Sequence, residues 1–239
     1  MDISTATPTA VGIALGISLL AGLSTGFGGL IVALKRAPGA GFLAGALGFS
    51  AGVMVYISFV ELLPQGIEGL AEAGSPRAEL WGTVAFFAGI GLIALIDRLV
   101  PEEINPHEEP SESGVSKAQL RNVGVLSAVA IAIHNIPEGI AVAVPLREAT
   151  GSRRKAAWWA TLSGLAEPLG AIVGYLLLQP FLGPQSLGIT FAAIAGIMVF
   201  VSLDKLLPTA IQTGKHHTAI YGMIVGMIVM AFSLLILPG

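Results

Sequence analysis

The chain has 239 residues, of which 54% are hydrophobic and only 11% are charged, and its mean hydropathy is +0.82. Soluble domains carry about 25% charged residues, so this composition excludes a globular protein that covers its surface with solvated side chains. The net charge of −3 and the lack of a basic stripe exclude nucleic acid as a partner, and the absence of cysteine excludes disulfides and thiolate metal sites.

Seven apolar segments follow one another along the chain, and each is long enough to cross about 30 Å of hydrocarbon at about 1.5 Å per residue. Glycines spaced four apart, such as Gly22 with Gly26 and Gly48 with Gly52, predict close helix packing. The sequence therefore predicts an all-α, polytopic transmembrane bundle with spans at Val11–Leu34, Gly41–Leu63, Leu80–Val100, Val123–Leu146, Ala156–Leu178, Leu187–Leu207 and Thr218–Leu237.

One long hydrophilic stretch, Pro101–Arg121, separates the first three segments from the last four. It is dense in carboxylates, proline and serine, and such a composition cannot build a core. We therefore predict a flexible acidic loop here, within a single integral membrane domain that occupies residues 1–239 in two halves.

Ionisable side chains stand beside prolines at four places in the apolar segments. Such side chains are costly in a membrane unless they face a partner or a wet cavity, and proline lacks an N–H, which frees the carbonyl four residues earlier. Charge beside loosened backbone is typical of transporter helices that line ion sites. The four places are Glu61 with Pro64; His134, Asn135 and Glu138 around Pro137; Glu167 with Pro168; and Asp204 and Lys205 with Pro208.

The densest of these places surrounds Pro137. His134 and Glu138 are four residues apart, so on a helix they share one face, with Asn135 in the adjoining turn. Imidazole, amide and carboxylate together suit zinc, iron(II), manganese or cobalt better than calcium. The pattern predicts a metal site, and the alternative is a histidine that serves only as a structural hydrogen-bonding group.

The run His134-Asn135-Ile136-Pro137-Glu138-Gly139 resembles the intramembrane metal motif of the ZIP (Zrt/Irt-like) transporter family, in particular of its prokaryotic branch. Phe49–Pro64 and Ser202–Pro208 resemble further helices of that family. The resemblance implies uptake of divalent metal, zinc foremost and also iron, manganese, cobalt or cadmium, across a prokaryotic cell membrane. The metal ion would be the transported substrate, with no cofactor and no enzymatic activity.

The resemblance also implies roles for individual residues. His134, Asn135 and Glu138 would be metal ligands, and Glu167 would be an additional ligand. Glu61 would lie on the ion path. Asp204 is the weakest assignment, because Lys205 follows it and would repel a cation.

The chain departs from the family pattern in one respect. Members of this branch have eight spans and two histidine–carboxylate segments, whereas this sequence provides seven spans and one such segment. Cytoplasmic loops favour Lys and Arg, and the loop charges fit an eight-span arrangement with the C-terminal half in its usual orientation. We therefore expect one helix to be missing between Arg121 and Arg147, with Val123–Leu146 placed abnormally.

Two other functions stay open at this point. An intramembrane metallohydrolase could hold zinc with His and Glu on a helix, although the sequence lacks the usual His-Glu-x-x-His pattern. A metal-binding membrane protein that no longer transports could result from the loss of a helix. The expected partners are divalent metal ions and the lipid bilayer, and the sequence leaves a homodimer open.

Overall fold

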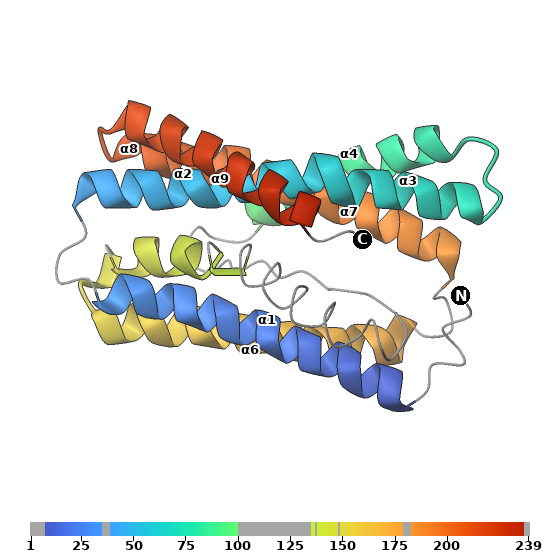
Figure 1. Cartoon of the computed structure of the whole chain (residues 1–239), viewed down its shortest axis with the longest axis horizontal. Coiled ribbons are helices and arrows are strands. Elements are labelled where there is room, and N and C mark those ends of the chain that lie inside the picture. Colours follow the sequence, from blue (N-terminus) through green and yellow to red (C-terminus); the bar gives the residue numbers. More distant parts are fainter. Residues whose placement is uncertain are drawn as a thin grey trace.

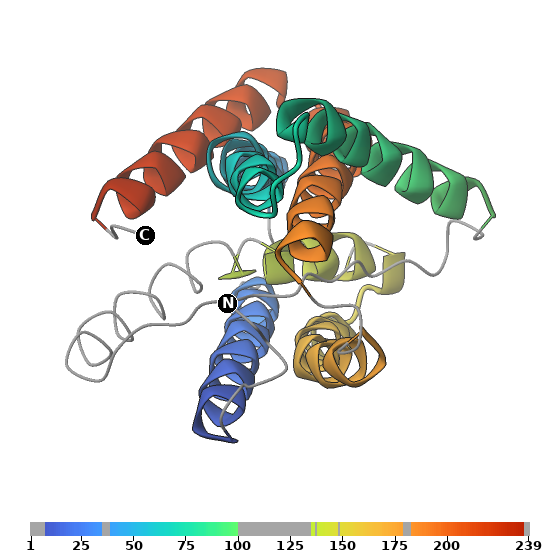
Figure 2. The same cartoon turned by 90° about the vertical axis from the view of Figure 1, so that its right-hand side faces the viewer.

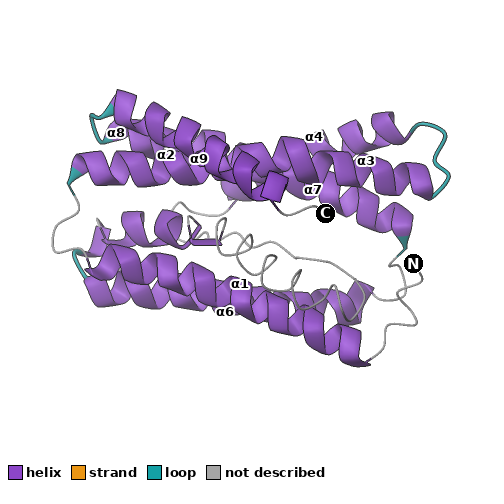
Figure 3. Ribbon diagram, in the orientation of Figure 1, coloured by secondary structure: helices purple, strands orange, loops and turns teal. Residues whose placement is uncertain are grey.

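The structure, a computed structural model, describes residues 8–34, 39–99, 135–136, 138–147, 149–178 and 183–236. These ranges are helical apart from short turns and contain no strand, which confirms the all-α prediction (Figure 3). The acidic loop Pro101–Arg121, His134 and the first part of the predicted span Val123–Leu146 lie outside the described residues.

Six of the seven predicted spans coincide with helices. Among the described residues, five stretches are long and apolar enough to cross a membrane, namely Gly12–Leu34, Ala40–Glu72, Ala78–Leu99, Pro184–Gln212 and His216–Ile236. In chain order the elements are α1 (Pro8–Leu34), α2 (Ala40–Ile57), η2 (Ser58–Leu62), α3 (Leu63–Glu72), α4 (Ala78–Leu99), α6 (Arg153–Leu178), α7 (Pro184–Val201), η4 (Ser202–Leu206), α8 (Leu207–Gln212) and α9 (His216–Ile236).

Two of the spans contain a π-helical turn just before a proline. Pro64 and Pro208 are the second residues of α3 and α8, and the π turns η2 and η4 precede them. The N–H of Leu63 donates to the carbonyl of Ser58, and the N–H of Leu207 donates to that of Ser202. The proline positions predicted a break with a loosened backbone, but the widened turn lets each helix continue through its proline.

Glycine brings α1 and α6 into contact. A Cβ atom at Gly22 would overlap the Gly164 carbonyl, and one at Gly29 would overlap the Ala160 side chain. The residue numbers in these contacts rise along α1 while they fall along α6, so the two helices are antiparallel. The small-residue pattern in the sequence therefore predicted a packing surface correctly.

The remaining spans pack in two further pairs. In the pair α2 and α9, Gly48 lies against the Ala219 carbonyl and Gly52 lies against the Met223 carbonyl, so these helices are parallel. In the pair α4 and α7, Gly89 lies against the Ala193 carbonyl. Figures 1 and 2 show the result as two layers, with α1 and α6 in one layer and α2, α3, α4, α7 and α9 in the other.

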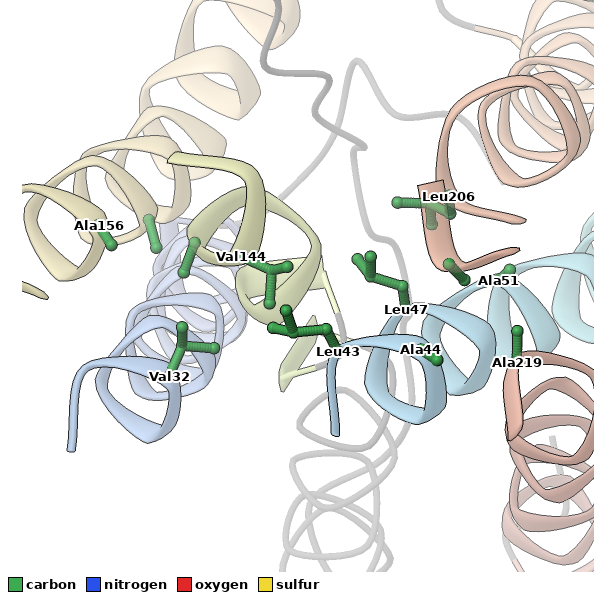
Figure 4. Packing of buried hydrophobic residues seen from close by; sticks show 12 residues of the cluster. Val32, Leu43, Ala44, Leu47, Ala51, Val144, Ala156, Leu206 and Ala219 are labelled. Atoms are coloured by element: carbon green, nitrogen blue, oxygen red, sulfur yellow. The ribbon is translucent and has the colours of Figure 1, made fainter. Parts of the chain in front are cut away.

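A hydrophobic cluster joins the two layers at one end of the bundle (Figure 4). It contains Val32 from the end of α1, Leu43 and Leu47 from the start of α2, and Val144 between them. Residues from the starts of α6 and α9 and from α8 complete it: Ala156, Ala160, Ala219 and Ala210. The ends of α1 and α8 and the starts of α2, α6 and α9 therefore lie at one end of the molecule, on the left in Figure 1.

This arrangement bears on the expectation that Val123–Leu146 is not placed as an ordinary span, of which the structure describes residues 135–136 and 138–146. After α4, an ordinary crossing would place the start of α6 beside the α3–α4 turn, yet α6 begins at the opposite end (Figure 1). Residues 138–147 also run parallel to α1, because Gly139 lies beside Thr25 and Arg147 lies beside Val32. The C-terminal half thus keeps the direction expected for eight spans.

Charge is distributed unequally between the two ends. Among the described residues between Leu146 and the start of α9, five basic residues belong to the end that holds the cluster: Arg147, Arg153, Arg154, Lys155 and Lys215. In the part of the chain that the structure describes, Arg77 is the basic residue of the α3–α4 turn at the other end. The difference matches the charge asymmetry of membrane proteins, in which basic residues gather on the cytoplasmic side.

Candidate metal site

Three polar side chains from three different segments meet inside the α1/α6 layer. The Thr25 hydroxyl on α1 donates to Glu167 Oε1 on α6 at 2.8 Å. The Asn135 amide Nδ2 donates to Glu167 Oε2 at 3.0 Å and approaches Thr25 Oγ1 at 3.5 Å. Both oxygens of the Glu167 carboxylate therefore accept a hydrogen bond from a neutral group.

All three members of this network are buried. Their exposed fractions are 1% for Thr25, 5% for Asn135 and 6% for Glu167. An ionised carboxylate removed from water is stable only with hydrogen bonds and a compensating charge. A place where a buried carboxylate, an amide and a hydroxyl converge within helices of membrane-spanning length is therefore suited to a cation.

Glycines allow the three backbones to approach closely enough to form the network. A Cβ atom at Gly28 would overlap the Ile136 carbonyl, and one at Gly139 would overlap the Thr25 carbonyl. On the other side, a Cβ atom at Gly164 would lie 2.9 Å from the Thr25 Cβ. The glycine that follows Glu138 in the motif is thus the residue that lets this segment rest on α1.

The predicted ligands around Pro137 are described only in part. Asn135 lies in the network, and Glu138 is partly buried in the short helix of residues 138–147 that follows it. His134 and Pro137 lie outside the described residues, so the predicted pairing of His134 with Glu138 stays a prediction.

Arg147 fixes the far end of that short helix. Its side chain is only 8% exposed, and its Nη1 donates to the carbonyl of Val32 in the last turn of α1. The short helix is therefore held to α1 at both ends, through Asn135 and Gly139 near the network and through Arg147 near the hydrophobic cluster. From the sequence alone, Arg147 is predicted only as a loop charge.

The other two predicted site residues lie in the π turns of the opposite layer. Glu61 is half-buried in η2 and accepts a hydrogen bond from Gln65 Nε2. Asp204 in η4 lies 3.3 Å from the Lys205 ammonium. Among the contacts of the described residues, none joins Glu61 or Asp204 to the Thr25 network, and no three His, Cys, Asp or Glu side chains gather as a metal cluster.

Sequence reasoning missed Thr25 and Asp97. The Asp97 carboxylate on α4 pairs with Lys205 Nζ at 2.9 Å, so Lys205 lies between two carboxylates. Neither residue has a neighbouring proline, which was the signal that pointed to the other polar sites. The glycines on both sides of Thr25 were a usable signal, because a hydroxyl within a small-residue face lies at a helix contact.

Helices of membrane-spanning length that enclose a buried polar network define an integral, multi-pass membrane protein of the ion-transporting class. The family profile described as ZIP Zinc transporter matches residues 113–234. The chain is also similar to bacterial proteins named Zinc transporter ZupT. The one from Corynebacterium efficiens is 55% identical over 93% of this chain and 96% of its own length. The one from Streptococcus mutans is 47% identical over 92% of this chain and 96% of its own length.

These matches show that the chain belongs to the ZIP family of zinc transporters. Membership places it in the bacterial cell membrane as a multi-pass protein, and it favours transport over the two rival functions, the metallohydrolase and the non-transporting metal binder.

The alignments also bear on the expectation that one helix is missing from this chain. The alignment with Zinc transporter ZupT of Corynebacterium aurimucosum covers 98% of both chains and extends over 266 positions, although this chain has only 239 residues. The relative therefore carries at least 27 residues that this chain lacks. A helix of that length would measure about 40 Å, which is enough for one membrane span.

Proposed function

We propose that this protein takes up divalent metal ions, zinc foremost, into the cytoplasm through the site formed by α1, the His134–Glu138 segment and α6. The observation that carries this proposal is the buried Glu167 carboxylate, which Thr25 and Asn135 hold next to the segment that contains Glu138. Membership of a zinc-transporter family supports zinc as the substrate. Iron, manganese, cobalt and cadmium are further candidate substrates.

The hydrogen bonds suggest which atoms would bind the ion. Asn135 uses its Nδ2 to donate to Glu167, so the amide oxygen Oδ1 is its ligand atom. Glu138 and Glu167 would contribute two negative charges, which match those of a divalent cation, and His134 would contribute an imidazole nitrogen. A set of nitrogen and oxygen ligands of this kind is well suited to zinc.

Transport through such a site would proceed by ligand exchange. Side-chain oxygens and imidazole would replace the hydration waters of the ion one after another, with binding tight enough to select and weak enough to release. Glu61, half-buried in η2 in the opposite layer, would lie on the path of the ion. No covalent step is needed.

The proposed topology places the basic end of the bundle in the cytoplasm, because basic residues gather on that side of membrane proteins. Because the chain has no cysteine, single cysteines can be introduced at Ser75 in the α3–α4 turn, at Ser152 before α6 and at Gln212 at the end of α8. In intact cells, a membrane-impermeant thiol reagent should label position 75 and not positions 152 and 212. Labelling of all three, or of 152 and 212 alone, would contradict the proposed orientation in the membrane.

The ligand role is tested by Glu138→Ala. Removing this carboxylate takes away both charge and coordination, so saturable zinc uptake into cells should fall to background while the protein stays in the membrane. The matched control is Glu68→Ala, since Glu68 is an exposed carboxylate on α3 and should leave uptake unchanged. Uptake by Glu138→Ala at the wild-type rate would place the site elsewhere.

A further inference from the structure

We propose that Thr25 is a positioning residue that sets the metal selectivity of the site, acting through the Glu167 carboxylate; this inference rests on the proposed function. Thr25 is the most deeply buried member of the network, at 1% exposure. It lies on α1, away from the metal-binding motif in the sequence, and nothing in that motif predicts it.

The hydroxyl proton of Thr25 has two acceptors within reach. Glu167 Oε1 lies at 2.8 Å, whereas the carbonyl of Ala21 in the preceding turn lies at 3.4 Å. The shorter contact has the length of a good O–H···O bond, and a charged acceptor strengthens it further. A hydroxyl has one proton, so Thr25 gives it to the carboxylate.

The carboxylate is therefore held at both oxygens and from two directions. Thr25 on α1 engages Oε1 and Asn135 engages Oε2. Two anchors restrict rotation of the carboxylate about its terminal bond. Close packing of Gly164 against the Thr25 Cβ, at 2.9 Å for an added Cβ, fixes the position of the hydroxyl relative to α6. Held in this way, Glu167 offers a metal ion one oxygen at a time.

This restraint would distinguish between metals. Zinc binds four ligands and accepts a carboxylate through a single oxygen. Manganese prefers six oxygen ligands, so it gains more from a carboxylate that can turn and bind through both oxygens. Loss of the Thr25 hydroxyl would remove one of the two anchors of the carboxylate and should raise the preference for manganese relative to zinc.

The test compares three substitutions of Thr25 by their zinc and manganese uptake. Thr25→Val keeps the shape of the side chain and removes the hydroxyl. Thr25→Ala removes the hydroxyl and the methyl group, whereas Thr25→Ser removes only the methyl group. The measured quantity is the ratio of kcat/KM for zinc to kcat/KM for manganese. We expect this ratio to fall about tenfold in the Val and Ala variants, the size of one hydrogen bond to a charged group, and to stay at the wild-type value in the Ser variant.

A purely structural role for Thr25 would lower uptake of both metals together, and the ratio would not change. Three results would therefore overturn the inference: an unchanged ratio in Thr25→Ala, an equal shift in Thr25→Ser, or an effect ordered by side-chain size. Glu138→Ala, measured in the same cells, separates this inference from the proposed function. If Glu138→Ala loses uptake and the Thr25 variants keep the wild-type ratio, only the role of Thr25 is wrong.

Discussion

Two parts of this molecule place ionisable side chains within membrane-spanning helices, and they do so differently. In the α1/α6 layer, Glu167 is 6% exposed, and its described hydrogen bonds come from the neutral groups of Thr25 and Asn135. In the opposite layer, the Lys205 ammonium lies 2.9 Å from Asp97 and 3.3 Å from Asp204. The second arrangement contains its own cation, whereas the first is the place where we propose that a metal ion binds.

The two π turns of the opposite layer, η2 and η4, also differ in the charge that they carry. Ser58 donates to the Met54 carbonyl and Ser202 donates to the Met198 carbonyl, each at 2.7 Å, so both turns have the same hydrogen-bonded frame. Counting from these serines, Glu61 in η2 occupies the place of Lys205 in η4. The two turns thus share the same backbone geometry and serine hydrogen bond, but one carries the negative charge of Glu61 and the other the positive charge of Lys205. The turn is therefore a structural feature that does not depend on the charge of the side chain at this place.

The largest effect on zinc uptake is expected from Gly139→Ala, which would disrupt the close packing around Thr25, Asn135 and Glu167. The added Cβ would overlap the Thr25 carbonyl, so the short helix must move away from α1. Overpacking of this kind costs about 1–3 kcal/mol, and the displacement should also separate Asn135 from Glu167. Zinc uptake should fall to near background.

The matched control for Gly139→Ala is Gly91→Ala on α4. No atom lies within 4 Å of a Cβ added at Gly91, so this variant should transport normally. Thermal unfolding of both purified variants measures the packing cost directly. Normal uptake by Gly139→Ala would show that the close approach of the short helix to α1 is not required for the site.

A smaller effect is expected from Asn135→Ala. This variant removes one of the two anchors of Glu167 and the amide oxygen assigned as a ligand, but it leaves Glu138 and Glu167 in place. The KM for zinc uptake should rise about tenfold, in line with one lost hydrogen bond to a charged group. Gln212→Ala, an exposed amide at the end of α8, serves as the control. A KM equal to that of the wild type would remove Asn135 from the ligand set.

The smallest effect on uptake is expected at Lys205. Lys205→Met leaves Asp97 and Asp204 without their ammonium partner, so the melting temperature should fall. Exposed ion pairs contribute little free energy, so zinc uptake should change by less than about twofold. Adding Asp97→Asn should restore part of the melting temperature, because it removes one of the two carboxylates. A loss of uptake as severe as that of Gly139→Ala would move the functional site to η4.

Much of the fold could be predicted from the sequence, because long apolar runs have few alternatives to membrane helices. The bounds of α1, α4 and α9 agree with the predicted spans to within a few residues. Pro64 and Pro208 correctly located irregular turns, although not their π-helical form, whereas α6 continues as an α-helix through Pro168. The π-helical form depends on how the hydrogen bonds rearrange before Pro64 and Pro208, and the residue types do not specify it.

The site could be predicted only where the motif or a neighbouring proline marks a polar residue. Thr25 and Asp97 are single polar residues on apolar helices, and their importance depends on which helix packs against them. Glu167 was predicted from its proline, yet the hydroxyl that donates to it is 142 positions away in the chain. The direction of residues 138–147 likewise follows from contacts with α1, which no local pattern encodes.

Zinc uptake into proteoliposomes that contain the purified full chain is the most direct test of the central claim. We expect saturable entry of zinc that exceeds entry into protein-free vesicles, and we expect Glu138→Ala to abolish it. This measurement shows whether the chain can transport zinc although it lacks at least 27 residues that a 53% identical relative has. Entry no faster than into protein-free vesicles, from a protein that still binds zinc, would contradict transport and leave a metal-binding membrane protein.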